Sequence, residues 1–392
     1  MLTPQRQNSL EKPSLLQLFL FFIALGATAF GGVAMVPYIH RLAVDDKRWL
    51  RDESFRDGVA LCQAIPGATS IQVSTYVGFR AAGLAGAAVT FLAFSLPAFV
   101  FMMILSALYA RFHALPAIIV VFGGLQAIVV AIVAAATISF GRTTLRDAWD
   151  VALAALAALL YTYLNHPFLV VLVAGVLGVI VFRKVTAPEE RLTTSASPHY
   201  EKSFLLLLLG TGVALILLFF GQRRLFDLVI LMFKIAVAAF GGGFAALPLM
   251  FHEIVQVRHW MDGPTFLNGI ALGQLTPGPV VITAGFIGYL LSGPVGGAVA
   301  TLAVFFPSFL ILLALVPSLD RLRHSPYFRT ATRGILGSFV GLLLTVTIHL
   351  AATISWDYRR IFLTVASFVA LLLGVRIPWV VLPGILISWL IF

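Results

Sequence analysis

Two short segments combine a Pro-Gly corner with hydrogen-bonding side chains inside otherwise apolar stretches. Residues 63–69 read Gln-Ala-Ile-Pro-Gly-Ala-Thr, and residues 274–279 read Gln-Leu-Thr-Pro-Gly-Pro. Because proline fits the first turn of a helix, each corner predicts a helix start whose backbone N–H groups have no helical partner. Those donors and the positive helix end favour an anion; the alternative is a tight turn that binds nothing. The candidate binding residues are Gln63, Pro66, Gly67, Thr69, Ser70, Gln274, Thr276, Pro277, Gly278 and Pro279.

A pair of glycines precedes each corner. Gly31-Gly32 and Gly241-Gly242 both lie late in a long apolar run and shortly before a proline. Glycine allows a helix to unwind or another backbone to approach closely. The alternative is close packing between membrane helices, where small residues are common. The matching positions lead us to add all four glycines to the candidate binding residues.

Five ionisable residues near these segments are candidates for anion attraction or proton movement. Lys234 lies in the middle of an apolar run, where a lone Lys costs at least about 2.5–3.5 kcal/mol. It therefore either attracts an anion or extends its ammonium group toward the membrane surface. Arg80 faces either the headgroups or the anion path. His40, His252 and Glu253 follow the Gly-Gly-Pro elements as proton-coupling candidates, the alternative being solvated loop ends.

The composition requires these residues to function inside a membrane. Of the 392 residues, 60% are hydrophobic and only 11% charged, which excludes a soluble enzyme, a nucleic-acid-binding domain and a disordered protein. The net charge of +10 fits basic loops beside anionic lipid, together with an anionic solute. Cys62 is the sole cysteine, and the sequence has no nucleotide, zinc-protease or nucleophile-elbow motif. We therefore expect no enzyme activity, no cofactor and no metal.

Apolar runs long enough to cross a bilayer are frequent along the chain. Two stretches, 149–183 and 361–392, contain a proline in the middle, which predicts a pair of short helices in each. Two others, 59–80 and 266–291, contain so many Gly, Pro, Gln, Ser and Thr residues that we expect broken or re-entrant segments. Plain spans are expected near 15–38, 84–110, 115–140, 203–220, 225–250, 294–318 and 334–354.

The chain contains an internal duplication. Phe30-Gly31-Gly32 recurs at an offset of 210, and the Pro-Gly corner recurs at an offset of 211. A polar linker and one additional hydrophobic helix, 203–220, separate the two copies. The expected division is a cytoplasmic N-terminal tail at 1–14, a first repeat at 15–183, a linker with its connecting helix at 184–225, and a second repeat at 226–392.

The connecting helix decides the relative orientation of the repeats. If each repeat crosses the membrane an even number of times, one additional crossing inverts the second repeat. We expect an all-α integral membrane protein of about 13 helices, with two inverted-topology repeats of broken and short helices. The alternative is a parallel duplication. With the N-terminus inside, Lys and Arg are moderately enriched in the cytoplasmic loops. The segment 40–58 is the exception, and its near-balanced charge predicts an amphipathic surface helix.

The duplicated pattern FGG–P–W–F–G–Q–PG[AP]–G–G closely resembles that of the chromate transporter (CHR) family in its long, two-domain form. The resemblance implies a multi-pass protein of the bacterial inner membrane that exports chromate and confers chromate resistance, driven by proton motive force or membrane potential. It also implies antiparallel halves. In the second repeat the family signature corresponds to Gly241, Gly242, Trp260, Pro277, Gly278 and Pro279. The first repeat has Ala68 where the final proline is expected, so the half-sites are not equivalent.

These observations predict a secondary transporter that binds a tetrahedral dianion where the two broken Pro-Gly segments meet. Backbone N–H groups and hydroxyls would bind it, with Lys234 or Arg80 contributing charge. One alternative is a transporter of sulfate or another oxyanion, and a second is a non-transporting membrane scaffold. The expected partners are chromate or sulfate and the lipid bilayer, with no nucleic acid. A homodimer, the coupling ion and the half-site that binds substrate stay open at this stage.

Overall fold

In the computed structural model, residues 11–28, 30, 35–182, 198–318 and 325–391 are described. Their regular structure is helical apart from two isolated β-bridges, which confirms the all-α class. Many large apolar side chains face outward, as lipid-facing residues do. By length and composition, five of the described helices can cross a membrane: Thr69–Phe112, Pro116–Thr144, Lys202–Gly221, Val280–Leu315 and Pro326–Ala352.

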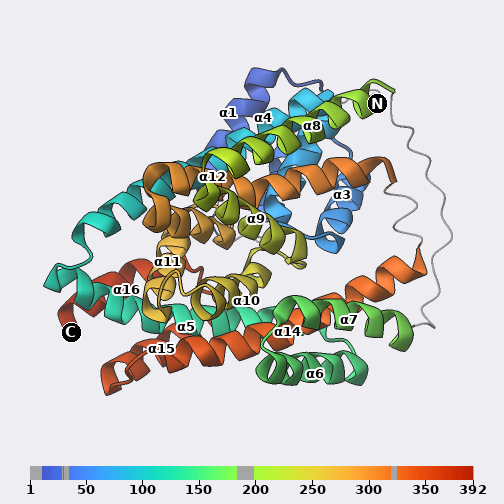
Figure 1. Cartoon of the computed structure of the whole chain (residues 1–392). Helices are drawn as coiled ribbons and strands as arrows, with labels where there is room; N and C mark the ends of the chain where they lie inside the picture. The colour runs from blue at the N-terminus through green and yellow to red at the C-terminus, as the bar shows by residue number, and fades with distance from the viewer. Residues whose placement is uncertain (1–10, 29, 31–34, 183–197, 319–324, 392) are drawn as a thin grey trace, which may run out of the picture.

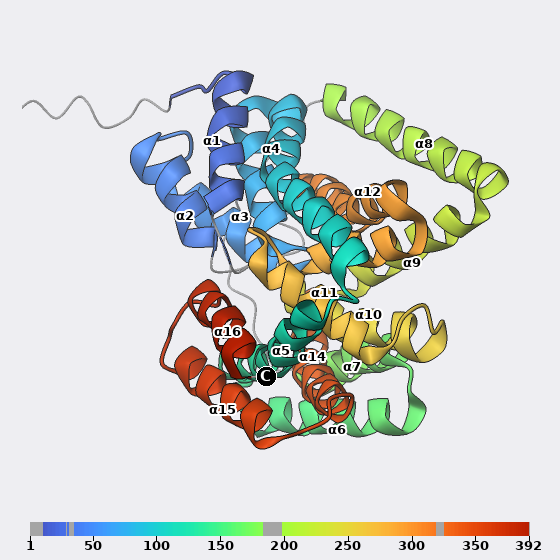
Figure 2. The same ribbon diagram turned by 90° about the vertical axis from the view of Figure 1, so that its left-hand side faces the viewer.

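The helices form two layers, which are visible one above the other in Figures 1 and 2. The first, here called the hairpin layer, is built on α4, which packs against α1 and α12, while α12 packs against α9. Its elements are α1 (Leu15–Thr28), α2 (Val36–His40), η2 (Arg41–Asp46), α3 (Asp52–Ala64), α4 (Thr69–Phe112), α9 (Arg223–Ala238), η3 (Gly243–Ala245), α10 (Ala246–Phe251), η4 (His252–Val257), α11 (Gly263–Leu275), η5 (Val280–Ile282), α12 (Thr283–Leu315) and η6 (Val316–Ser318).

The second layer, here called the frame layer, interlocks the two repeats. Helix α14 packs on α6 and α7, while α5 packs on α15 and α16, so the long helix of each repeat holds the short helix pair of the other. The expected breaks of the two pairs are present. The elements are α5 (Pro116–Thr144), α6 (Ala148–Leu164), α7 (Pro167–Val181), α14 (Pro326–Ala352), α15 (Tyr358–Leu372) and α16 (Pro378–Ile391), and α8 (Pro198–Gly221) lies along the outside of the hairpin layer (Figure 2).

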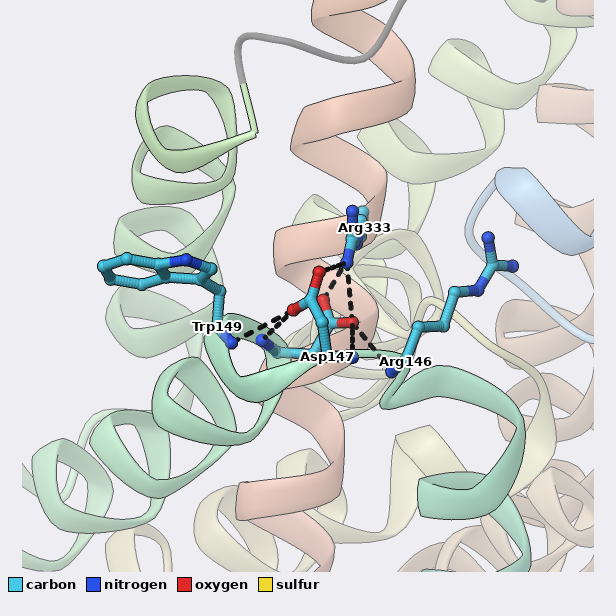
Figure 3. Close-up of polar contacts among 5 residues, drawn as sticks. Arg146, Asp147, Trp149 and Arg333 are labelled. Carbon is cyan, nitrogen blue, oxygen red and sulfur yellow. Dashed lines mark hydrogen bonds and ion pairs between the residues drawn. The ribbon is translucent and has the colours of Figure 1, made fainter.

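An ion cluster joins the repeats within the frame layer (Figure 3). The guanidinium group of Arg333 on α14 donates from Nε to Oδ1 of Asp150 (2.9 Å) and from a terminal nitrogen to its Oδ2 (2.8 Å). The same nitrogen lies 2.6 Å from Asp147, the N-cap of α6. Asp150 is 1% exposed, so its charge depends on these partners.

Both segments expected to be broken form helical hairpins. In the first, α3 ends at Ala64 and α4 begins at Thr69. The two arms lie so close that a Cβ on Gly58 would be 2.2 Å from the Tyr76 ring. The Tyr76 hydroxyl also donates to the Ser54 carbonyl at 3.0 Å. In the second hairpin α11 and α12 meet in the same way, with a Cβ on Gly269 placed 2.4 Å from Phe286.

A second turn follows each hairpin within α4 and α12. Ala82 and Ser292 leave helical geometry, and the next residues, Gly83 and Gly293, have φ of +64° and +63°. These left-handed values favour glycine. Each helix therefore consists of a hairpin arm and a longer span, as the sequence predicts for the span near 84–110.

Three expected helices differ in the structure. The helix expected at 15–38 ends at Thr28, and α2 begins at Val36. The helix expected at 225–250 ends at Ala238, before the glycines, and resumes as η3 and α10. The surface helix expected at 40–58 is wrong: η2 ends at Asp46 and α3 starts at Asp52, with Arg48 between them at a φ of +50°. In the last case the hydrophobicity pattern carries no signal for a left-handed residue.

Candidate functional site

The tip of each hairpin joins the glycine break of the other repeat. Pro66 forms an antiparallel bridge with Phe240, and Phe30 forms a parallel bridge with Gly278. The first contact is reinforced by the N–H of Gly67, which donates to the carbonyl of Ala239 at 2.8 Å. The broken helices of the two repeats therefore provide backbone hydrogen-bond partners for each other.

The glycines at these crossings hold conformations that favour glycine. Gly67, Gly278, Gly241 and Gly242 have φ of +120°, +113°, +88° and +101°. At Gly67 space is also restricted, because a Cβ would lie 2.5 Å from the Ser308 hydroxyl. The other two candidate glycines, Gly31 and Gly32, lie outside the described residues.

Both hairpin tips contact the segment 239–243 in the buried interior. The segment 239–243 contacts the first tip through Ala239 and Phe240, as described above. It contacts the second tip through Gly243, on which a Cβ would lie 3.3 Å from the backbone nitrogen of Val280. Gly67, Thr276 and Gly278 are all buried. Both corners therefore lie in the buried interior and contact one common segment.

The first tip is polar. Thr69, Ser70 and Gln72 open α4, and each side chain is at most 3% exposed. Gln72 donates its amide to the Pro66 carbonyl at 2.6 Å. Ser70 Oγ and Gln72 Oε1 are buried without a hydrogen-bond partner among the described residues. Because buried polar atoms are normally paired, these two mark a place where a ligand can bind.

The second tip is apolar. The residues after Pro279 are Val280, Val281 and Ile282, and the nearby hydroxyls donate locally, as Thr276 does to the Gly273 carbonyl at 2.8 Å. Gln274 contributes a buried amide nitrogen that lacks a hydrogen-bond partner among the described residues. The second tip therefore offers an anion fewer polar side chains than the first.

A matched pair of substitutions accompanies this difference. The N–H of Ala68 donates to the Ser308 hydroxyl at 2.9 Å. In the second repeat, Pro279 stands at the position of Ala68 and has no N–H, and Ala98 stands opposite Gly278, where Ser308 stands opposite Gly67. Ser308 was not among the sequence-predicted residues, although comparing the repeats at an offset of 210 would have paired it with Ala98.

Two of the candidate cations are not brought to the tips. Arg80 is exposed at the far end of the first arm of α4, about 16 Å along the helix from its start. Lys234 donates to Glu253 at 2.6 Å, and its ammonium group lies 3.9 Å from the Phe168 ring centroid. The Lys234 charge is therefore matched by a carboxylate, and in this arrangement it lies away from the hairpin tips.

A groove runs along the first hairpin beside its polar tip. Its volume is about 420 Å³. His40 donates from Nε2 to the Asp52 carboxylate at 2.7 Å, and this hydrogen bond holds the pKa of Asp52 below its ordinary value. The lining residues are Val36, Pro37, His40, Phe55, Arg56, Val59, Ala60 and Gln63. Gln63 and His40 are therefore groove residues, and Gln63 stands one helical turn before the tip.

The corresponding surface of the second repeat is covered. Leu247, Phe251 and Leu267, at the positions of Val36, His40 and Arg56, are at most 3% exposed. Helix α11 packs on α5 and α16 of the frame layer, whereas α3 packs on α2 and α4 of its own layer. The two hairpins therefore differ, because α3 borders an open groove whereas the frame layer covers α11. We call the covered side beside α11 the closed end of the boundary between the layers.

A hydrogen-bond chain holds the closed end. The Gln126 amide on α5 donates to Asn268 Oδ1 on α11 at 2.9 Å, and Asn268 donates to the Tyr109 hydroxyl at 3.0 Å. These three residues were not predicted from the sequence, because each lies alone on an apolar helix far from the others along the chain.

The remaining candidates, His252 and Glu253, lie at the closed end. Both side chains are buried on η4, at 3% and 6% exposed. Glu253 pairs with Lys234 and lies 3.5 Å from Arg258. Three residues predicted separately, Lys234, His252 and Glu253, are therefore one cluster at the boundary between the layers. This cluster is distinct from the hairpin tips.

Comparison with known proteins gives a consistent picture. The family model described as "Chromate transporter" matches residues 16–179 and 226–389. A chromate transport protein of Cupriavidus metallidurans is 31% identical over 364 residues, covering 92% of this chain and 88% of the relative. One from Pseudomonas aeruginosa is 29% identical, covering 96% and 92%. An uncharacterized transporter of Methanocaldococcus jannaschii is 39% identical, covering 98% and 97%. No solved structure matches.

Proposed function

From the premise that the chain belongs to the chromate transporter family, we propose that it exports chromate from the cytoplasm as a secondary transporter. The substrate binds at the meeting point of the two hairpin tips, chiefly against the first. The observation that carries this proposal is at the start of α4, where the Ser70 hydroxyl is buried without a hydrogen-bond partner among the described residues.

The start of α4 suits a tetrahedral dianion. The first N–H groups of a helix have no carbonyl partner within it, and here they belong to Thr69, Ser70 and Ile71. Chromate and sulfate present only acceptor oxygens, so the Ser70 hydroxyl donates to them while the helix end favours their charge. The Ala68 N–H is already bound by Ser308, which fixes the backbone approach to this site.

The two repeats have opposite orientations in this proposal. Helix α8 connects them. The most hydrophobic part of its segment Lys202–Gly221 is not buried against the described residues of the protein. That exposure supports a single crossing in contact with lipid, which inverts the second repeat. Inverted repeats with broken helices place a substrate site near the membrane midplane, in agreement with the crossing of tips and glycine breaks.

Membrane potential supplies the direction of transport. Moving one charge through 100 mV changes its free energy by about 2.3 kcal/mol. The free energy of a dianion therefore falls by about 4.6 kcal/mol when it leaves a cell whose interior is about 100 mV negative. Export then proceeds without a cation beside the substrate, which agrees with the Lys234–Glu253 pairing. The protein is placed in the bacterial inner membrane, where lowering cytoplasmic chromate confers resistance.

Uptake of radiolabelled chromate by everted vesicles tests the proposal. Vesicles that contain the protein should accumulate chromate when the interior is positive, and vesicles without it should not. Equal uptake by both would refute chromate transport. Competition by unlabelled sulfate and molybdate then separates chromate preference from transport of other oxyanions, because the first tip recognises a tetrahedral dianion in either case.

A pair of serine variants tests the site. Ser70→Ala removes a hydrogen bond to a charged ligand and should weaken chromate affinity about tenfold or more. Ser106→Ala is the matched control, since Ser106 lies on the same helix and its hydroxyl is also buried without a partner among the described residues. Equal effects of the two substitutions would show that Ser70 does not bind the substrate.

A further inference from the structure

The closed end of the boundary between the layers holds three histidines around one tyrosine. His252 on η4 belongs to the hairpin layer, while His166, Tyr161 and His349 belong to the frame layer. The ring of His252 lies 5.9 Å from that of His166 and 6.2 Å from that of Tyr161, measured between centroids. The ring of His349 lies 6.3 Å from that of Tyr161. We call these four residues the histidine cluster.

Gln256 binds the two layers together inside the cluster. Its Oε1 accepts from the Tyr161 hydroxyl at 3.3 Å and lies 3.2 Å from Nδ1 of His252. Because an amide oxygen only accepts, His252 carries its proton on Nδ1, and Nε2 has the lone pair that binds a further proton. A further proton on Nε2 leaves this bond in place, so it acts on the cluster through its charge and not through loss of the Gln256 contact.

Protons can reach the buried member of the cluster from the surface. His166 is exposed at the start of α7, whereas His252 is 3% exposed and Tyr161 1% exposed. A titratable side chain in water thus stands beside a titratable side chain inside the boundary. Imidazole groups change charge near neutral pH and transfer protons readily.

The charges around His252 oppose a second proton. Glu253, its neighbour on η4, already pairs with Lys234 of α9 and Arg258, so one carboxylate faces two cations. The frame layer contributes His166 from the start of α7, His349 from α14 and the Tyr161 hydroxyl from α6. Protonated histidines would therefore repel one another and Lys234, with no additional carboxylate among these neighbours to compensate.

We propose that the histidine cluster is a proton-binding site that keeps this end of the boundary closed when neutral and opens it when protonated. The proposal rests on the proposed function for its role in transport, where proton binding would release α10 and α11 from the frame layer. Beside the open groove, His40 instead pairs with Asp45 and Asp52 of its own layer. Proton binding thus acts on the closed end alone.

Hydrogen–deuterium exchange of the peptide 246–257 tests the site without any solute. After correction for intrinsic rates, exchange in the wild type should be about tenfold faster at about pH 5.5 than at about pH 8. His252→Gln should exchange equally at both values. His166→Gln, at an exposed position that tolerates substitution, should reduce the difference, and His113→Gln outside the cluster should leave it unchanged. Wild-type behaviour in all of the His166, His252 and His349 variants would overturn the proposal.

Transport in proteoliposomes separates this proposal from the proposed function. With equal pH on both sides and a fixed potential, the wild-type rate should rise about tenfold toward about pH 5.5, and His252→Gln should flatten that rise. A variant that keeps the full pH dependence argues against the cluster. A wild type that moves no chromate refutes the proposed function, while the exchange measurement still decides the histidine cluster.

Discussion

Removing the Arg333 charge should destabilise the frame layer more than removing an exposed ion pair would. Arg333 holds Asp150 through two hydrogen bonds and also covers the Phe182 ring, 3.9 Å from its centroid. Arg333→Met keeps an unbranched apolar stem and leaves the buried carboxylate without its cation. Breaking a buried pair in this way costs about 3–5 kcal/mol.

The structure places the expected cost near the lower end of that range. Asp150 Oδ2 also accepts from the backbone N–H groups of Arg146 at 2.8 Å and Asp147 at 3.3 Å, as Figure 3 shows, and these bonds survive the substitution. We expect a loss of about 3 kcal/mol. For a chain of this length that corresponds to a fall of about 4 °C in the unfolding temperature.

The assay is thermal unfolding in detergent, followed by tryptophan fluorescence, with two companion variants. Asp147→Asn keeps an N-cap oxygen and removes only the exposed pair with Arg333, so it should cost much less than Arg333→Met. Combining Arg333→Met with Asp150→Asn removes the uncompensated charge and should recover more than half of the loss. If Arg333→Met is as stable as Asp147→Asn, or if the double variant recovers nothing, the reasoning is refuted.

Two further outcomes follow from the same structure. Gly288→Ala should destabilise the turn within α12 at Gly293 by about 1–3 kcal/mol or more, because its Cβ would lie 2.2 Å from the Gly296 carbonyl oxygen. Gly212→Ala on α8 should be neutral or mildly stabilising, because a Cβ there would meet no described atom within 4 Å outside its own helical turn. Equal yields of monodisperse protein from the Gly288 and Gly212 variants would contradict this difference. The pKa of Asp147 is held below its ordinary value, first by the hydrogen bond from the Asp150 backbone N–H and then by the Arg333 guanidinium group. The resulting stabilisation is complete above the unfolded-state pKa of about 3.9 and is lost as pH falls through the folded-state value. Acid titration of the unfolding temperature should therefore show a shallower acid limb in Asp147→Asn than in the wild type.

The sequence predicts the positions of the helix breaks because their causes are local. Pro66 and Pro277 cannot continue a helix ladder, and the glycines at 241–242 relax its backbone, so each break is present where these residues stand. The difference between the corners was also visible, since Ala68 replaces a proline. The surface helix at 40–58 was wrong, because the left-handed turn at Arg48 has no signature in residue type.

The partners of the broken ends were beyond sequence reasoning. The bridge between Pro66 and Phe240 joins residues far apart in the chain, and nothing in either segment specifies the other. The same holds for His252, whose neighbours His166 and Tyr161 come from the other layer. Lys234 shows the difference most clearly, because its place in an apolar run required a partner but did not identify Glu253.

By itself, the sequence determined a duplicated, all-α membrane chain with interruptions at defined residues, because hydrophobicity, proline and glycine act over one or two helical turns. The tertiary structure alone decided that both hairpin tips contact the segment 239–243 and that the Ser70 hydroxyl of the first tip is buried without a partner among the described residues. It also decided that the frame layer covers α11 while a groove lies along α3. Those features depend on which surfaces of distant helices pack together, and packing is a property of the whole fold.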